Sequence, residues 1–105
     1  SVLDAIGRIR QRQPGAKAEG FAGDLGSAAE AENLFAKHPS VDILVNNAGY
    51  GQPGHFEEVG WATHQDFIAL MATSYAHLAH LFLPGMQARG YGRIINVASV
   101  AGLVP

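Results

Sequence analysis

Apolar residues recur at helical spacing in three stretches of the chain, and each stretch is bounded by residues that start or stop helices. The first ends at Pro14–Gly15. The second is expected to open with a capping box formed by Ser27 and Glu30, and to stop before Pro39. The third runs over residues 61–83, just before a proline expected to kink it. It is apolar on two sides, which predicts a helix buried against two neighbours.

Short apolar runs between these helices predict three strands, at residues 16–23, 41–46 and 93–98. The run 43–45 is rich in β-branched residues and too short for a helix, which is typical of a parallel strand covered on both faces. In the first run only Phe21 favours a strand, so that prediction is weak. Alternating helices and strands predict a parallel α/β sheet with right-handed crossovers.

Composition narrows the possible functions. The 105 residues suffice for one small domain, and 48% of them are hydrophobic, as in globular proteins. Seven basic and nine acidic residues are interspersed, so no basic stripe favours nucleic-acid binding. No uninterrupted apolar run approaches the ~18 residues that span a membrane. The absence of cysteine excludes disulfides and thiolate metal sites and leads us to expect a cytoplasmic protein.

Polar residues follow the central strand at the end where parallel sheets bind ligands. The segment Asn46-Asn47-Ala48-Gly49 resembles the Asn-Asn-Ala-Gly motif of short-chain dehydrogenases/reductases. The segment from Gly92 to Gly102, which contains Ser99, resembles a second block of that family at the correct separation. Asp24-Leu25 is similar to the family's Asp-Val/Leu pair. The resemblance extends over almost the whole chain.

The resemblance implies the middle of a doubly wound Rossmann domain of about 250 residues, with three strands and the intervening helices. It implies an oxidoreductase that moves hydride between NAD or NADP and an alcohol or ketone. Asp24 and Leu25 would contact adenine, the Asn47-Ala48-Gly49 segment would line the nucleoside, and Ser99 would hydrogen-bond the substrate oxygen. Helix 61–83 resembles the helix through which family members dimerise, so we expect a homo-oligomer.

Each of these residues also has a plainer interpretation. Asp24 can cap the following helix, and Ser99 can be an ordinary serine at a strand end. Asn46 and Asn96 are expected to be structural amides. No carboxylate or cysteine is spaced to join the histidines at 77 and 80, so we expect no metal site.

The sequence also contains a Gly-x-Gly-x-x-Gly pattern, but the residues around it do not fit a dinucleotide-binding loop. Residues 49–54 match Gly-x-Gly-x-x-Gly after a strand, but that fingerprint requires a helix opening at its second glycine. Pro53 removes one of the N–H donors, and no strand ending in an acid follows about 20 residues later. We therefore interpret these residues as a loop.

The sequence departs from the family in three places. The Gly-rich phosphate loop is missing, and so is the catalytic Tyr-x-x-x-Lys, because none of the three tyrosines has lysine four residues later. Met71 stands where the family usually has an asparagine that supports a proton-relay water, and a thioether cannot donate a hydrogen bond. A nearby hydroxyl, Thr73 or Ser74, is the alternative donor.

These departures lead to expectations about the chain by itself. Residues 16–23 would lack the neighbouring strands of the family sheet, so we expect the chain alone to be molten at best, to bind no nicotinamide cofactor and to be inactive. The sequence does not distinguish NAD from NADP and does not identify the substrate. A catalytically weak dinucleotide-binding relative and a dimer-forming module remain as alternatives.

Overall fold

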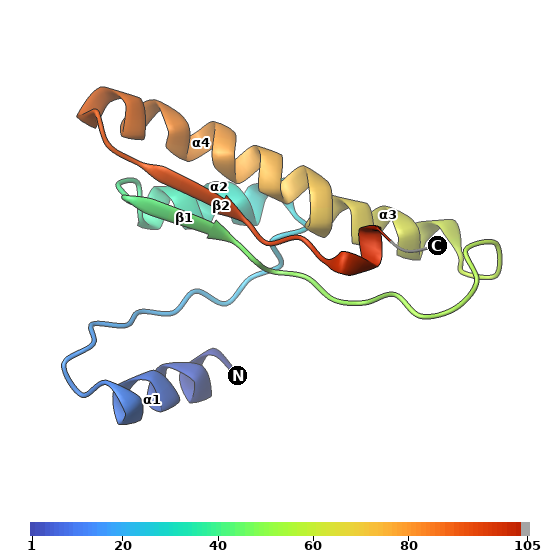
Figure 1. Cartoon of the computed structure of the whole chain (residues 1–105), viewed down its shortest axis with the longest axis horizontal. Helices are drawn as coiled ribbons and strands as arrows, with labels where there is room; N and C mark the ends of the chain where they lie inside the picture. The colour runs from blue at the N-terminus through green and yellow to red at the C-terminus, as the bar shows by residue number, and fades with distance from the viewer. Residues whose placement is uncertain (104–105) are drawn as a thin grey trace.

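The computed structural model describes residues 1–103 and places helices against one face of a small parallel sheet (Figure 1). The helices are α1 (Val2–Arg12), α2 (Ala28–Lys37), α3 (Trp61–Ile68) and α4 (Ser74–Arg89), and the strands are β1 (Ile43–Asn46) and β2 (Arg93–Asn96). A π-helical segment, η1 (Ala69–Thr73), joins α3 to α4, and a 3₁₀ turn, η2 (Val100–Gly102), follows β2.

The two strands pair in parallel, as expected, with Ile43 opposite Arg93 and Asn46 opposite Asn96. Side chains alternate between faces along a strand, and here only one face is covered. Leu44 and Ile94 pack towards α2 and α4, whereas Ile43, Val45 and Ile95 are each about half exposed. The expectation of a strand covered on both faces is therefore wrong for residues 1–103, in which no element lies over the second face.

Residues 16–23 do not form the predicted third strand. They run as extended chain without a paired neighbour within residues 1–103, so the sheet has two strands instead of three. Side chains hold this segment at two points: Arg10 donates to the Ala18 carbonyl at 3.2 Å and Lys37 donates to the Gly20 carbonyl at 3.3 Å. Low β-propensity and the lack of an adjacent strand explain the difference.

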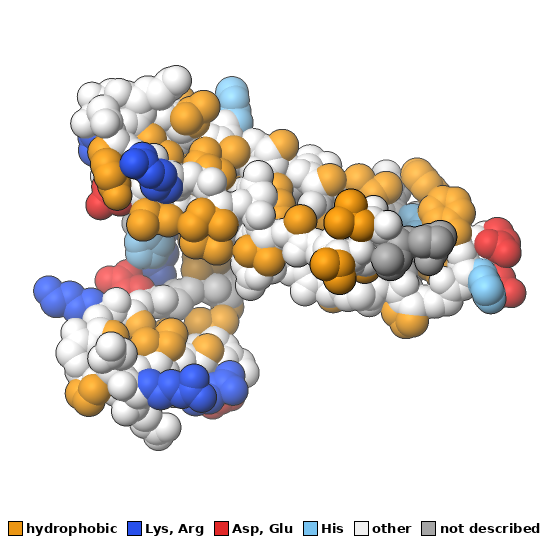
Figure 2. All heavy atoms as spheres, in the orientation of Figure 1, with side chains coloured by type: hydrophobic (Ala, Val, Ile, Leu, Met, Phe, Trp, Pro, Cys, Tyr) orange, Lys and Arg blue, Asp and Glu red, His pale blue; other side chains and the backbone are white. Residues whose placement is uncertain are grey.

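Helix α1 lies apart from the sheet, at the far end of this extended segment (Figure 1). Its side chains Val2 and Ile6 sit so close to Gly20 that a Cβ there would overlap them. Figure 2 shows the resulting separate lobe, with positively charged Lys and Arg side chains on its surface. Helix α1 opens with a capping box of Ser1 and Asp4, and hydrogen bonds from the Ser1 hydroxyl and the N-terminal ammonium lower the pKa of Asp4.

The core is the contact between α2, α4 and the covered face of the sheet. Its buried apolar side chains are Ala31, Leu78, Phe82 and Met86. Phe35 of α2 meets Phe82 edge to face, with ring centroids 5.1 Å apart. Such pairs contribute roughly 0.5–1.5 kcal/mol beyond the area they bury. Arg89 adds a hydrogen bond from the end of α4 to the Val41 carbonyl at 2.7 Å.

The predicted end of the long helix is wrong, because the helix continues through Pro84 to Arg89. Proline removes only one backbone hydrogen bond, and the buried side chains Phe82 and Met86 hold the helix on either side of it. The helix instead ends at Gly90, whose φ of 69° is the left-handed conformation that glycine adopts at helix ends.

The predicted capping box of the second helix is also not formed. Ser27 is the N-cap of α2, but its side chain makes no capping hydrogen bond. Glu30 instead lies beside Gly23 and Asn33, where it accepts a hydrogen bond from the Asn33 amide at 3.5 Å.

The continuous helical run Trp61–Arg89 has a window of mean hydropathy 1.3 and is long and apolar enough to cross a membrane by length and composition alone. The sequence nevertheless contains no uninterrupted apolar run of that length, because polar residues such as Asp66 and His77 lie within this helical run. In the structure α4 packs against α2, β1 and β2, and 17% of the apolar window is buried among the described residues.

Candidate functional site at the carboxyl ends of the strands

Both strands end in an asparagine, and the two side chains meet on the helix-covered side of the sheet. The Asn46 amide nitrogen donates to the Asn96 side-chain oxygen at 2.9 Å and to the Tyr75 carbonyl at 3.3 Å. Asn46 is only 3% exposed, and its own oxygen is buried without a hydrogen-bond partner within residues 1–103. The expected structural role of these two amides is confirmed. They fix the strand ends from which the following loops leave.

The segment 47–49 leaves β1 as an exposed loop held by α4 and η1. The Tyr75 hydroxyl donates to the Ala48 carbonyl at 3.1 Å. The Met71 sulfur lies against Gly49, so closely that a Cβ on Gly49 would overlap it. The sequence pattern predicts neither contact, because it places Tyr75 and Met71 on apolar stripes of the long helix without indicating which residues they face.

Asp24 and Leu25 form the turn that leads into α2. The Asp24 carboxylate accepts a hydrogen bond from the Gly26 N–H at 2.9 Å, and its carbonyl accepts one from Ser27. The plainer interpretation of Asp24 as a helix cap is therefore wrong, because the N-cap of α2 is Ser27 and the Asp24 carboxylate holds the turn just before it. It also borders a pocket of about 270 Å³ together with Tyr50.

Leu25 is brought to the loop that follows β1. It lines a small pocket of about 90 Å³ with Asn47, Ala48 and Tyr75. The structure therefore brings the predicted residues of two distant segments, Leu25 and the Asn47–Ala48 pair, around one space.

Ser99 lies three residues beyond the end of β2. Its hydroxyl oxygen accepts a hydrogen bond from the Ala101 N–H at 3.1 Å and caps η2. The side chain is exposed, and the hydroxyl hydrogen remains able to donate to a ligand oxygen. Because β1 and β2 are parallel and in register, the Ser99 segment and the Asn47–Gly49 segment leave the same edge of the sheet.

The remaining candidate features do not join this edge. Residues 49–54 form no helix, so the interpretation of the Gly-x-Gly-x-x-Gly letters as a loop is confirmed. The His77 ring nitrogen Nε2 lies 3.8 Å from a carboxylate oxygen of Glu32 in α2.

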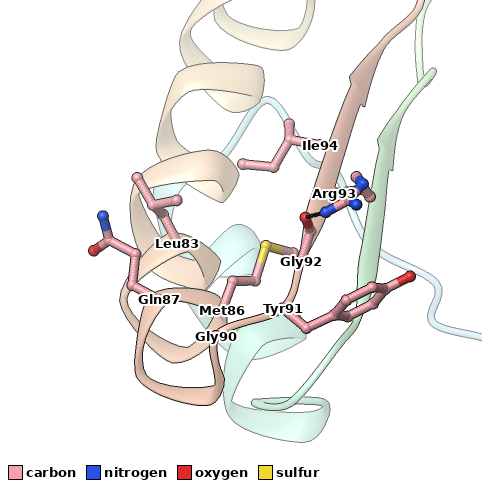
Figure 3. A pocket seen from close by; sticks show the side chains of 8 residues that line it. All are labelled: Leu83, Met86, Gln87, Gly90, Tyr91, Gly92, Arg93 and Ile94. Carbon is pink, nitrogen blue, oxygen red and sulfur yellow. Dashed lines mark hydrogen bonds between the residues drawn. The ribbon is translucent and has the colours of Figure 1, made fainter.

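A pocket of about 410 Å³ lies at the opposite end of α4, beside the start of β2 (Figure 3). Its arginine, Arg93, is occupied by the Gly92 carbonyl at 2.7 Å and the Tyr91 ring. Gln87 and Tyr91 are its other polar side chains. None of the site residues predicted from the sequence lines this pocket, so the strand ends are the better candidate.

Comparisons with known proteins agree with this geometry. The family model described as short chain dehydrogenase matches residues 3–105. The D-beta-hydroxybutyrate dehydrogenase of Cupriavidus necator is 38% identical over 104 residues, which cover 95% of this chain and 40% of that protein. The chain thus spans less than half the length of this curated relative.

Solved structures show the same arrangement. A short-chain dehydrogenase from Sphingobium yanoikuyae in complex with NADPH superposes with a TM-score of 0.86 at 31% identity, over 98% of this chain and 41% of that one. A metagenomic short-chain oxidoreductase in complex with NADP superposes with a TM-score of 0.83 at 34% identity, over 100% of this chain and 50% of that one. The Rossmann-like fold class is therefore confirmed.

Proposed function

This chain belongs to the short-chain dehydrogenase family, and from that membership we propose that it forms the central part of an NAD(P)-dependent oxidoreductase acting on an alcohol/ketone pair. The observation that carries the proposal is the parallel register of β1 and β2, which brings the Asn47–Gly49 and Ser99 segments to one edge of the sheet. Ligands of open α/β sheets bind outside that edge. The NADP and NADPH bound to the solved relatives support the cofactor class.

The residues around Asp24 fit the nucleoside end of such a cofactor. A carboxylate accepts hydrogen bonds from an amino group such as that of adenine, and the Leu25 side chain offers apolar surface to a flat ring. Both residues border pockets that they share with the loop after β1. We therefore assign Asp24, Leu25 and the Asn47-Ala48-Gly49 segment to nucleoside binding.

Ser99 is assigned to the substrate oxygen. A bound nicotinamide would supply hydride transfer to or from the substrate carbon, and the oxygen of that substrate gains or loses a proton as the carbonyl and alcohol interconvert. The Ser99 hydroxyl can donate a hydrogen bond to this oxygen and stabilise the charge that develops on it. The Tyr-x-x-x-Lys pair that exchanges the proton in the family is not within these 105 residues.

The test uses the longer polypeptide of which we propose this chain is a part. Ser99→Ala is expected to lower kcat/KM roughly 100-fold, the loss typical of one oxyanion-stabilising donor, and to leave the Kd for NAD(H) or NADP(H) unchanged. Ser40→Ala, a matched change at an exposed serine, is expected to have no effect. Failure of the polypeptide to bind or turn over either cofactor with a panel of alcohols and ketones would overturn the proposal.

A second candidate function is dinucleotide binding with weak catalysis, favoured by Met71. Its sulfur is packed on Gly49, so a side chain that cannot donate a hydrogen bond stands where the family usually has asparagine. If this candidate holds, Met71→Asn raises kcat without tightening cofactor binding. An unchanged or lower kcat would remove it.

We also propose that the complete polypeptide pairs with a second copy through the helical run that begins at Trp61. Trp61, Ile68 and Leu83 expose between 43% and 64% of their surface along this run, which is available apolar area for a partner helix. Sedimentation of the polypeptide as a monomer would contradict this assignment.

A further inference from the structure

We infer that Tyr75 is a positioning residue, which orients the Ala48–Gly49 peptide so that the Gly49 N–H is presented to the dinucleotide. The inference rests on the function proposed above. It adds a residue of α4 that would act on the cofactor only through the loop after β1.

A reciprocal pair of hydrogen bonds links α4 to the end of β1. The Asn46 side chain donates to the main-chain carbonyl of Tyr75 at 3.3 Å, and the Tyr75 side chain donates to the main-chain carbonyl of Ala48 at 3.1 Å. Each residue thus uses its side chain to bind the backbone near the other. We call this pair of hydrogen bonds the latch. It fixes the loop after β1 relative to α4 at Asn46 and at Ala48.

The helix side of the latch is firmly held. Ser74 and Leu78, which flank Tyr75 in α4, are 5% and 4% exposed. Asn46 is also tied to Asn96 at 2.9 Å, so the strand side is equally fixed. The Tyr75 backbone is therefore fixed, and its hydroxyl donates from that position to the Ala48 carbonyl in an exposed hydrogen bond, so this carbonyl points towards Tyr75.

Planarity of the peptide bond carries this orientation to Gly49. The chain has no cis peptide bond within the described residues, and in a trans peptide the carbonyl and the N–H point in opposite directions. Because the Ala48 carbonyl points to Tyr75, the Gly49 N–H points away from the Tyr75 hydroxyl. Within residues 1–103 this N–H donates to no other group, so it is available to a ligand.

Met71 closes the other side of the loop. Met71 belongs to the π-helical segment that immediately precedes α4. Its sulfur and methyl group lie where a Cβ on Gly49 would be. The thioether limits rotation of Gly49 without competing for its N–H, because sulfur in a thioether is at most a weak acceptor. Gly49 is thereby held between an oriented peptide and a packed side chain.

Tyr75→Phe tests the inference, because it removes the hydroxyl and keeps the ring. In the longer polypeptide, we expect the Kd for NADP⁺ or NAD⁺, whichever binds more tightly, to rise about three- to tenfold, as for the loss of one hydrogen bond. Binding is measured by calorimetry at a temperature at which both proteins are fully folded. Tyr91→Phe, the same chemical change at the opposite end of α4, is expected to leave the Kd unchanged.

A second readout needs no cofactor. A hydrogen bond to a carbonyl polarises the whole peptide group, so Tyr75→Phe is expected to shift the amide ¹⁵N resonance of Gly49 more than that of Gly102 in the free protein. Tyr91→Phe is expected to move neither resonance.

The outcomes separate this inference from the proposed function. Tight cofactor binding by the wild type with an unchanged Kd in Tyr75→Phe would overturn the latch and keep the oxidoreductase. A wild type that binds neither dinucleotide would overturn both. An unmoved Gly49 resonance would show that the Ala48 carbonyl is not held by Tyr75, and would also overturn the inference.

Discussion

At the scale of single residues, Asn46 is the point at which the two strands and the long helix are tied together. An amide at the end of a buried strand is costly unless it is hydrogen-bonded, and the sequence therefore indicates that Asn46 and Asn96 tie the strand ends together. The Asn46 nitrogen does so, although Asn96 is exposed and the Asn46 oxygen has no partner within residues 1–103. The partners of Tyr75 and Met71 could not be predicted in the same way. Tyr75 lies 27 positions from Ala48, and contact between them depends on the rotation of the helix about its axis. Sequence periodicity indicates which side of a helix is apolar but does not assign a tyrosine hydroxyl to a particular carbonyl.

Asn46→Ala is expected to destabilise the complete polypeptide by roughly 1–3 kcal/mol, because the two hydrogen bonds from the Asn46 amide to the Tyr75 carbonyl and the Asn96 side chain are lost. Asn33→Ala, at an exposed amide with a 3.5 Å hydrogen bond to Glu30, is the matched control and is expected to change stability by less than about 0.5 kcal/mol. Urea unfolding midpoints at a constant m-value measure both. Equal midpoints for the two variants would contradict the structural role.

At the scale of elements, regular patterns were predictable and their ends were not. The helical runs and the two paired strands lie where apolar spacing places them. The intrinsic effect of proline predicts that the long helix ends before Pro84, whereas the packing of Phe82 and Met86 carries α4 past it. The predicted first strand was missed because a strand requires a neighbour, which is a property of the sheet and not of the eight residues themselves.

The close approach of α4 to β2 gives an element-scale prediction. A Cβ on Gly92 would overlap the Cβ atom of Met86, which cannot move without moving the helix. Gly92→Ala is therefore expected to destabilise the complete polypeptide by about 1–3 kcal/mol through overpacking. Gly51→Ala is the control, because a Cβ there would meet no atom within 4 Å and the φ of Gly51 is not positive. Thermal unfolding of the two variants in parallel measures the difference in stability. Coincident unfolding curves would contradict the prediction, because they would mean that α4 and β2 can move apart at little cost in free energy.

At the scale of the whole molecule, residues 1–103 build one covered face of a sheet and leave the other bare. Only four apolar side chains are buried among these residues, while Ile43, Val45 and Ile95 remain about half exposed. Helix α1 stands apart on an unpaired segment (Figure 1). The resemblance to the family predicted that the strands are parallel, and we propose that other parts of a longer polypeptide cover the bare face.

The isolated 105-residue chain is accordingly expected to lack a sharp thermal transition, to bind a hydrophobic dye and to bind no nicotinamide cofactor. Scanning calorimetry and near-ultraviolet circular dichroism measure the first property, and fluorescence measures the other two. A sharp, cooperative transition with a strong near-ultraviolet signal would contradict this expectation and would show that one helical layer suffices.

The π-helical segment Ala69–Thr73 is a place where the gene can lose one codon and the protein can keep its fold. A π turn holds one residue more than an α turn, so loss of a single codon within this segment would restore a regular helix and leave Phe67 against Tyr50 and Leu78 in the core. The same loss elsewhere in the helix would rotate one half against the other by about 100°. The five residues around Met71 are therefore the place where the length of this helix can vary during evolution without refolding what lies on either side.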